Sequence, residues 1–344
     1  MQERKKIKVG FSIGDLNGIG GELIVKTLCK KIMLESFIPV VYASSKTISF
    51  LSEYFGCSTI LNSITDLNDA SEHKINIIDV WSEEINIQFG IKSERAGYYS
   101  FLSLRAAVED LKQDLIDILI TAPIDKLNIQ SEKFNFPGHT NYLEEKLKGD
   151  SLMFMISDDL KVALLTDHVP VNEVINSINP SLILNKFRTL EKTLIMDFGI
   201  TTPRIAILGI NPHAGDGGVI GAEDDLILKP TIKKLKEQGK KVLGPYSADS
   251  FFLNRNLKRF DAVLASYHDQ GLIPFKTLTF GKGVNFTAGL NKIRTSPDHG
   301  TAYEIAGKGI ANTDSFEECI FKGIEIFKQR KRYQKQKIDN KGNL

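Results

Sequence analysis

Short apolar runs alternate with segments of helical period along most of the chain. Eight of these runs have the length of buried strands: Ile7–Ile13, Phe37–Tyr42, Ile75–Val80, Leu115–Thr121, Leu152–Ile156, Lys161–Leu165, Arg204–Gly209 and Asp261–Ala265. Three longer segments, Glu94–Lys112, Pro180–Phe198 and Asp224–Gly239, have the apolar spacing or the end signals of helices. Strands that alternate with helices predict an α/β fold with a mainly parallel sheet covered on both faces.

The composition changes this picture little. The chain has 344 residues, of which 42% are hydrophobic and 25% are charged, as in an ordinary soluble globular protein. This length allows one large domain or two moderate ones. The net charge of +2 is too small to indicate nucleic acid binding. The basic tail Lys328–Lys337 is better explained as a solvated, frayed helix end than as a nucleic-acid arm.

No segment predicts secretion or a membrane span. After the basic start Met1–Lys8, a glycine and an aspartate interrupt the apolar run, which argues against a signal peptide. No apolar stretch approaches the roughly 20 residues that a span needs. Cys29, Cys57 and Cys319 form no CxxC pair and fit inert thiols in a reducing compartment. We therefore expect a soluble, cytoplasmic protein without nucleic-acid or membrane partners.

Five of the six histidines fall in short stretches rich in Gly, Pro, Asp or Thr, each after an apolar run. They are His139, His168, His213, His268 and His299. Loops at strand ends hold the chemistry of α/β enzymes, so we expect these side chains to gather at one edge of a sheet. Imidazole is the commonest protein metal ligand and a proton carrier near neutral pH. A metal-assisted active site is the first hypothesis.

His168, His213 and His268 are the preferred metal ligands. They lie in three separate loops, and three protein ligands with an open position are typical of catalytic zinc-type sites. Any one of them could instead bond a backbone carbonyl, because no HxH or HExxH motif ties the three together. The ion stays open among zinc, magnesium, manganese and cobalt.

A second set of residues suits a phosphate group and lies in the Gly-rich region after His268: Lys276, Lys282, Asn285, Lys292 and Arg294. Arginine and lysine bind phosphate oxygens, and glycine-rich backbone adds N–H donors. Lys282 and Lys292 are better explained as solvated surface lysines, whereas the other three stand in an apolar context. His139 and Thr140 open the predicted helix Asn141–Lys148, whose N-terminus favours an anion.

Together these motifs resemble the 4-hydroxythreonine-4-phosphate dehydrogenase family over essentially the whole chain. The matching segments are Pro137–Thr140, Thr166–Pro170, Gly209–Gly218, Gly244–Asp249, Tyr267–Lys276, Gly281–Asn285 and Arg294–Ala302. The turn Gly14–Glu22 lacks the GxGxxG spacing of a Rossmann domain. It is similar to the GDGIGPE turn of the isocitrate/isopropylmalate dehydrogenase superfold, and His299–Asn312 is similar to the adenosine-binding loop of that superfold. Three residues depart from these patterns: Gly21, Asn141 in place of the usual Glu, and Tyr303.

The resemblance implies a two-lobed α/β/α fold with the active site in the interdomain cleft. We place residues 1–125 and 300–344 in the first lobe, and residues 126–299, with the metal loops and dimer contacts, in the second. It also implies a homodimer with a shared active site, in which the partner subunit supplies His268.

The implied activity is the metal-dependent, NAD- or NADP-linked oxidation and decarboxylation of 4-phosphohydroxy-L-threonine to 3-amino-2-oxopropyl phosphate, in pyridoxal phosphate biosynthesis. One divalent metal on the three histidines would stabilise the developing alkoxide. The implied substrate contacts are His139, Thr140, Lys276, Asn285 and Arg294. The implied cofactor contacts are His299, Gly300, Ala302 and Asn312. The general base is expected to be Asp249 or Lys276.

Several alternatives stay open. Relatives in this family also oxidise threonate or erythronate phosphates, so a related substrate is the first alternative. A zinc hydrolase, which needs no nicotinamide cofactor, is a second. A phosphosugar-binding module, which the phosphate residues alone would permit, is a third.

Overall fold

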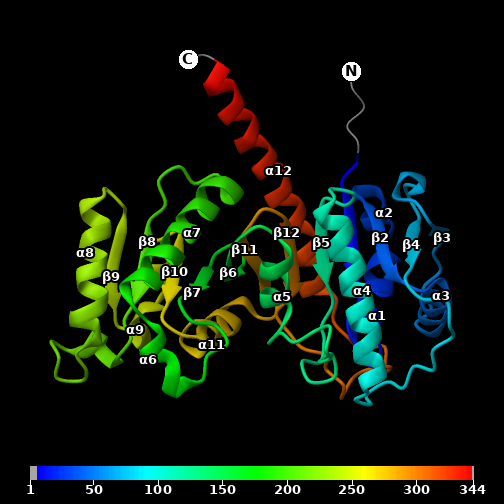
Figure 1. The fold of residues 1–344 in the computed structure, drawn as a ribbon, viewed down its shortest axis with the longest axis horizontal. Helices are drawn as coiled ribbons and strands as arrows, with labels where there is room; N and C mark the ends of the chain where they lie inside the picture. The colour runs from blue at the N-terminus through cyan, green and yellow to red at the C-terminus, as the bar shows by residue number, and fades with distance from the viewer. Residues whose placement is uncertain (1–5, 343–344) are drawn as a thin grey trace. The chain divides into compact units, whose positions relative to one another are not determined.

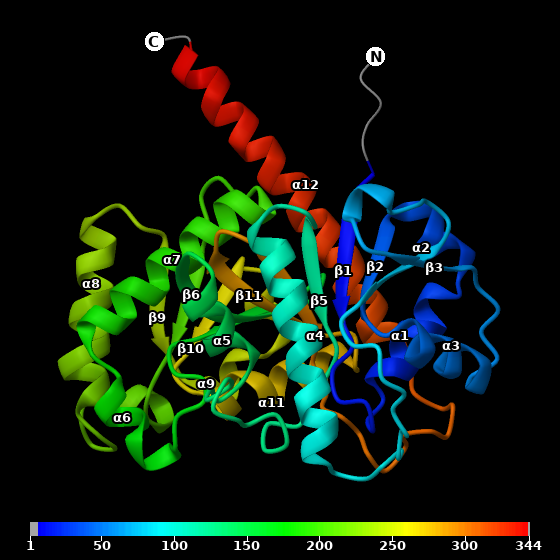
Figure 2. The ribbon, with the colours of Figure 1, turned by 45° about the vertical axis from the view of Figure 1, so that its right-hand side comes forward.

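The computed structural model describes residues 6–342, and Figures 1 and 2 show its elements. Residues 1–5 and 343–344, which the sequence analysis assigned to the first lobe, lie outside the described part. The chain forms two compact units: unit 1 is residues 1–148 and 291–327, and unit 2 is residues 149–290 and 328–344. No helix described here has both the length and the apolar character needed to cross a membrane.

Unit 1 contains six parallel strands, in the order β3 (Leu61–Ile64), β4 (Ile75–Asp79), β2 (Ile38–Ala43), β1 (Lys8–Ser12), β5 (Ile118–Thr121) and β12 (Ile293–Pro297). Every residue of β1 and β2 is buried, as expected for strands covered on both faces. The helices of this unit are α1 (Gly20–Leu28), α2 (Lys31–Ser36), α3 (Ser45–Tyr54), α4 (Glu94–Lys112), α5 (His139–Lys146) and the first part of α12 (Asp314–Gly342), with the short turn η1 (Leu67–Asp69). Helix α4 packs on β1, β2 and β5 (Figure 2).

Unit 2 contains β11 (Val284–Leu290), β6 (Gly149–Ile156), β7 (Lys161–Leu164), β10 (Ala262–Ala265), β8 (Ile205–Leu208) and β9 (Val242–Tyr246), in that order. The pairs β11–β6 and β6–β7 are antiparallel, and β7, β10, β8 and β9 are parallel. The helices are α6 (Val174–Ser177), α7 (Pro180–Phe198), α8 (Lys229–Glu237), α9 (Ala248–Phe251), α10 (Asn254–Leu257) and α11 (His268–Thr279), with the turns η2 (Val171–Glu173), η3 (Pro212–Gly215) and η4 (Asp224–Leu228). Helix α8 lies beside β9 (Figure 1).

The predicted α/β fold with mainly parallel strands is confirmed, and each of the eight predicted runs overlaps a strand. Helix α7 shows why its bounds were predictable. Its N-cap Asn179 accepts a hydrogen bond from the Leu182 N–H at 3.0 Å, and Pro180 begins the helix. The helix ends at Gly199, whose φ of 71° is the left-handed conformation that glycine adopts readily.

Four strands were not predicted: β3, β9, β11 and β12. The sequence of β11 lies in the Gly-rich stretch that we expected to approach a ligand, and β12 contains the polar residues Arg294–Ser296. Strand β9 contains Gly244 and Pro245, which normally mark a turn. In β9, β11 and β12, sheet pairing overrides a local preference against a strand.

The two units divide the chain at different residues from the expected lobes. Residues 126–148 belong to unit 1, where Phe134 and Tyr142 pack against Phe101 of α4 with ring centroids 6.0 and 6.3 Å apart. The basic tail is also more ordered than expected, because α12 continues to Gly342. The prediction of a solvated, frayed end is wrong for Arg330, which is buried and paired with Asp197.

Candidate active site

Four loops of unit 2 bring chemically capable side chains to the carboxyl ends of four neighbouring parallel strands. His168 follows β7, His268 follows β10, His213 follows β8 and Asp249 follows β9. Because β7, β10, β8 and β9 are parallel and adjacent in this order, all four loops leave the same edge of the sheet. This is the edge at which open α/β sheets bind their ligands. Of the five histidines singled out, His168, His213 and His268 lie here, whereas His139 and His299 lie in unit 1.

The adjacent strands β7 and β10 place two imidazoles side by side. The ring centroids of His168 and His268 lie 6.0 Å apart. Two imidazoles that bind one ion, with a metal–nitrogen distance of about 2.0–2.1 Å, have centroids roughly 5–6 Å apart. His268 Nδ1 lies 2.7 Å from Asp269 Oδ1, a contact that orients the ring. The two side chains therefore fit as neighbouring ligands of one divalent ion.

His213 lies one strand further on, in a loop of unusual conformation. Its φ is 54°, and Ala214 and Asp216 also have positive φ values of 52° and 43°. Such backbone conformations cost energy, and they persist only where the surrounding structure holds them in place. The buried carboxylate of Asp224 does so, because it accepts the N–H groups of Ile210 at 2.9 Å and Asn211 at 3.0 Å. The sequence analysis missed Asp224, whose only signal was its place at the start of a predicted helix.

One chain does not assemble the three predicted metal ligands. Over residues 6–342, no three His, Cys, Asp or Glu side chains come close enough together to hold a metal ion. His168 and His268 are brought together, and His213 does not join them.

The two candidates for the general base lie in different elements of unit 2. Asp249 is near the start of α9, where the Ser247 hydroxyl donates to its Oδ1 at 2.6 Å. This hydrogen bond lowers the pKa of Asp249, and the nearby His213 lowers it further. Lys276 is an exposed residue in the last turn of α11, the helix that begins at His268. Asp249 is therefore an ionised carboxylate close to one of the three histidines.

In unit 1, Arg294 and His139 form a buried basic site. Arg294 in β12 is 2% exposed, and its Nε donates to Thr121 Oγ1 at 3.0 Å. Burial lowers the pKa of the Arg294 guanidinium to about 10, so it stays charged at neutral pH. Burial also lowers the pKa of His139 well below its usual range, and the charges of Arg294 and Lys126 lower it further. The His139 imidazole is therefore neutral, and it lies where an anion would be attracted.

Buried polar atoms without a hydrogen-bond partner mark several predicted positions. Within the described part of the chain they include His139 Nε2, Asn141 Oδ1, Asn285 Oδ1 and His299 Nε2. Each such atom costs about 1–3 kcal/mol unless a ligand or water satisfies it. Three of the four were predicted as substrate or cofactor contacts. Thr140, beside His139, is buried as well.

The predicted cofactor segment His299–Asn312 packs on the Gly14–Glu22 turn within unit 1. The Ile19 N–H donates to Thr301 O at 3.0 Å, and the Tyr303 hydroxyl donates to Asp15 Oδ2 at 2.9 Å. Asp15 is inaccessible to solvent, and burial raises the pKa of its carboxyl. The sequence analysis missed Asp15, and it noted Tyr303 only as a departure from the superfold. The turn therefore supports this segment.

The four predicted cofactor contacts have different surroundings. His299 Nδ1 lies 3.1 Å from the oxygen of Gly300, which is exposed. Ala302 has a positive φ of 44°. Asn312 Oδ1 accepts the Asp314 N–H at 2.7 Å, so this side chain caps α12. The structure gives Asn312 a structural role that the sequence did not indicate.

Comparisons with known proteins agree with these motifs. The family described as "Pyridoxal phosphate biosynthetic protein PdxA" matches residues 35–322. The 4-hydroxythreonine-4-phosphate dehydrogenase of Bacteroides thetaiotaomicron is 42% identical over 339 residues, covering 98% of this chain and 93% of the relative. The D-threonate 4-phosphate dehydrogenase of Cupriavidus necator is 36% identical over 327 residues, covering 94% of this chain and 98% of the relative.

Solved structures agree as well. The crystal structure of 4-hydroxythreonine-4-phosphate dehydrogenase from Klebsiella pneumoniae superposes with a TM-score of 0.82 at 31% identity, covering 95% of this chain and 99% of that one. The fold, the order of the motifs and the coverage of nearly the whole chain all point the same way. The chain belongs to the pyridoxal phosphate biosynthetic protein PdxA family.

Proposed function

We propose that this protein is a 4-hydroxythreonine-4-phosphate dehydrogenase. It oxidises 4-phosphohydroxy-L-threonine with NAD or NADP and releases carbon dioxide and 3-amino-2-oxopropyl phosphate. The observation that carries the proposal is the relative of that name, which is 42% identical over 98% of this chain. Because these relatives are dehydrogenases over their full length, the hydrolase and the binding module are no longer retained as alternatives.

The reaction requires four features: residues that bind the phosphate, a binding site for the dinucleotide, a base, and a positive charge that stabilises the substrate oxygen. In the first step the carbinol carbon gives a hydride to the nicotinamide, and the hydroxyl proton goes to a base. The resulting β-keto acid loses its carboxylate as carbon dioxide, and the enolate that remains takes up a proton. The oxidation releases one proton and the protonation of the enolate consumes one, so the base can give the enolate the proton that it took from the hydroxyl.

As substrate contacts we propose Arg294, His139, Thr140, Asn285 and Lys276. The charged, buried guanidinium of Arg294 and the unsatisfied Asn285 Oδ1 and His139 Nε2 support this assignment. A carbonyl-type oxygen such as Asn285 Oδ1 needs a donor, so it suits a substrate hydroxyl or ammonium better than a phosphate oxygen.

We propose His168, His213 and His268 as the metal ligands. The contact of His268 with Asp269, which orients the imidazole, supports a divalent ion. When bound, such an ion supplies Lewis-acid stabilisation of the negative charge that develops on the substrate oxygen. Imidazole ligands favour zinc or cobalt over magnesium.

We also propose a homodimer with a shared active site, to which His268 of the partner subunit contributes. Its support is that one chain, over the residues described, brings no three donors close enough together to hold an ion. For the base, the ionised carboxylate of Asp249 can accept a proton, although its lowered pKa makes it a weak base. Lys276 is the second candidate. A cytoplasmic location stays a prediction.

The test is absorbance of the reduced nicotinamide, measured with purified protein, a divalent metal and 4-phosphohydroxy-L-threonine, with NAD and NADP in separate runs. Reduced cofactor that a chelator abolishes and added metal restores is the expected result. No reduced cofactor with that substrate would overturn the assignment.

The second candidate is D-threonate 4-phosphate dehydrogenase. A relative with that name is 36% identical over 94% of this chain. Erythronate 4-phosphate is a further substrate of the same kind. Running the same assay with both compounds decides between the candidates, because kcat/KM ratios measure discrimination directly.

A further inference from the structure

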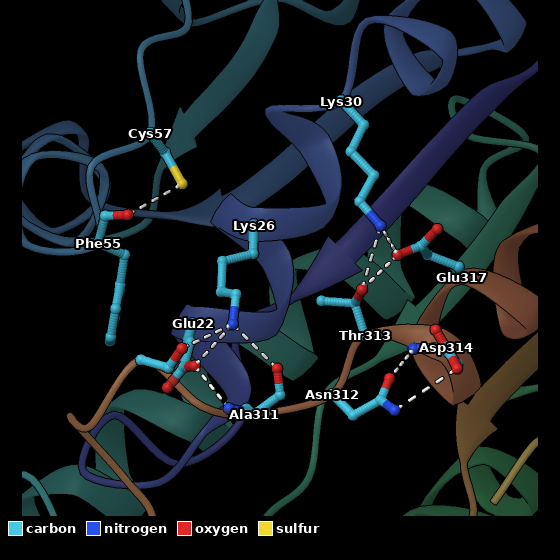
Figure 3. Close-up of polar contacts among 11 residues, drawn as sticks. Glu22, Lys26, Lys30, Phe55, Cys57, Ala311, Asn312, Thr313, Asp314 and Glu317 are labelled. Atoms are coloured by element: carbon cyan, nitrogen blue, oxygen red, sulfur yellow. Dashed lines mark hydrogen bonds and ion pairs between the residues drawn. The ribbon is translucent and has the colours of Figure 1, made fainter.

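Two side chains of helix α1 hold the backbone of Gly309–Ala311. Glu22 and Lys26 are four residues apart, so they lie on the same side of the helix. Lys26 Nζ donates to Glu22 Oε1 at 3.2 Å, to Gly309 O at 3.0 Å and to Ala311 O at 3.0 Å. Glu22 Oε1 also accepts the Ala311 N–H at 2.9 Å. Figure 3 shows both side chains directed at this segment, where they bind both polar backbone groups of Ala311.

Burying this charged pair costs free energy. The Glu22 side chain is inaccessible to solvent, and the Lys26 side chain is 28% exposed. A buried carboxylate is tolerated only when it is paired and hydrogen-bonded, and its second oxygen, Oε2, has no partner among the residues described. All three donors of the Lys26 ammonium are used. An amphipathic helix can pack without a buried ion pair. The particular effect of the Glu22–Lys26 pair is therefore to fix the segment that it binds.

The fixed segment is the C-terminal end of His299–Asn312. Gly309 has a φ of 70°, a left-handed conformation that glycine adopts readily. Because glycine has no side chain, its backbone is also freer to move than that of other residues. Ala311 is buried, whereas Ile310 is 64% exposed. At the other end of the segment, the Tyr303 hydroxyl bonds to Asp15. The Glu22–Lys26 pair thus holds the part of the segment whose own sequence is least able to hold a conformation.

We propose that Glu22 and Lys26 are positioning residues for the dinucleotide cofactor. They keep residues 309–312 in the conformation that receives the adenosine half of the dinucleotide. This role rests on the proposed function, in which His299–Asn312 binds the cofactor. Neither side chain takes part in hydride or proton transfer. Loosening the pair therefore weakens dinucleotide binding and leaves the chemical step and the phosphorylated substrate largely unaffected.

The experiment compares Lys26→Met with the double variant Glu22→Gln/Lys26→Met. The double variant is needed because Lys26→Met alone leaves the Glu22 charge buried without its partner, which can compromise folding. In both, the Kd for NAD (or NADP, if the wild type prefers it) is expected to rise about tenfold, the effect of losing charged hydrogen bonds. The dinucleotide KM should rise in parallel, while kcat at saturating dinucleotide and the KM for 4-phosphohydroxy-L-threonine stay within roughly twofold. Lys26→Arg keeps the charge and should recover most of the affinity.

The matched control is Lys30→Met. Lys30 lies one turn further along the chain, where its Nζ bonds Thr313 Oγ1 at 3.2 Å and pairs with Glu317 at the start of α12 (Figure 3). It contacts the chain just beyond the cofactor segment, so its loss should lower the melting temperature without changing the dinucleotide Kd.

Two results would overturn the positioning role. One is an unchanged dinucleotide Kd in the Lys26→Met and double variants. The other is a loss of dinucleotide affinity in Lys30→Met as large as in Lys26→Met, which would mean a general structural effect. If the wild-type protein binds neither NAD nor NADP, the proposed function fails and the positioning role fails with it. If the wild type binds the dinucleotide and the variants bind it equally well, only the positioning role fails.

Discussion

Arg330 of α12 and Asp197 of α7 form a buried, bidentate ion pair within unit 2. The Arg330 Nε lies 2.7 Å from Asp197 Oδ1, and the Nη2 lies 2.9 Å from Oδ2. Arg330 Nη1 also donates to Leu290 O at 3.2 Å, at the end of β11. The two residues are 6% and 2% exposed. One arginine thus ties the end of the chain to a helix and a strand of the same unit.

We predict that Arg330→Met lowers the free energy of unfolding by about 3–5 kcal/mol, because it leaves the Asp197 carboxylate buried without a partner. Chemical denaturation measures the change. Lys335→Met is the matched control, since it removes a positive charge from an exposed position of the same helix and should cost less than about 0.5 kcal/mol. An Arg330→Met variant as stable as the control would show that the ion pair contributes nothing.

Asp79, at the end of β4, should make unit 1 sensitive to acid. Burial opposes its ionisation, but donation from the Ser63 hydroxyl at 2.6 Å and from the Ser45 N–H and hydroxyl outweighs burial, so the pKa of Asp79 is lowered. A carboxyl with a lowered folded-state pKa stabilises the fold above its unfolded pKa of about 3.9, and this contribution is lost as the pH falls through the folded value.

We therefore predict that wild type exceeds Asp79→Asn in unfolding free energy at pH 7 and that the difference shrinks below about pH 4. Asp79 is exposed, so solvent screening limits the difference to less than about 1 kcal/mol. A pH series of urea denaturations measures it. Asp159→Asn, at an exposed turn between β6 and β7, is the control and should change the unfolding free energy at pH 7 by less than about 0.5 kcal/mol. A difference that persists unchanged to pH 3 contradicts the assignment.

Much of the fold followed from the sequence because strands covered on both faces leave continuous apolar runs. Strands β1 and β2 are of this kind, and every residue in them is buried. Strand β12 was missed because it is recognisable only through its partner β5, about 170 residues earlier, with Ile293 opposite Ile118. A local pattern holds no information about such pairing. Strand β11 was missed for the same reason, since its partner β6 lies more than 100 residues away.

The candidate site was predictable in its residue types and less so in its assembly. The sequence indicated His168 and His268, but their closeness depends on β7 and β10 being neighbours in the sheet. The residues that hold the loops could not be recognised from the sequence. Asp224 acts on backbone N–H groups of the preceding loop, and Lys26 acts on carbonyl groups more than 280 residues away. Side chains that bind backbone leave no motif, because any residue can supply the partner.

The thiol of Cys57 should react slowly although it is only half-buried. Burial, together with the contact of the Cys29 thiol, raises its pKa to about 11. The sequence did not indicate this contact, since the two cysteines form no CxxC pair. Only the thiolate is nucleophilic, so at pH 8 we predict that Cys57 reacts with iodoacetamide roughly a hundredfold more slowly than an unperturbed thiol.

Peptide mass spectrometry after timed alkylation measures this rate, which should rise about tenfold per pH unit between pH 7 and 9. In Cys29→Ser the neighbouring thiol is removed, and Cys57 should react faster than in the wild type. Rapid alkylation of Cys57 at pH 8 in the wild-type protein would be incompatible with the environment described here.

Asp269 should influence metal affinity without binding the ion. Its Oδ1 lies 2.7 Å from His268 Nδ1, so it orients the ring and leaves Nε2 for a ligand. Replacing such an orienting carboxylate typically weakens metal binding about 10- to 100-fold. We predict this loss for Asp269→Asn, measured as the zinc or cobalt Kd in competition with a chelator, with little change in melting temperature of the metal-free protein because Asp269 is exposed. His268→Ala should lose more affinity than Asp269→Asn, and Asp159→Asn should lose none. Equal metal affinity in Asp269→Asn and wild type would mean that His268 is not oriented by this contact, and equal affinity in His268→Ala would remove His268 from the proposed metal ligands.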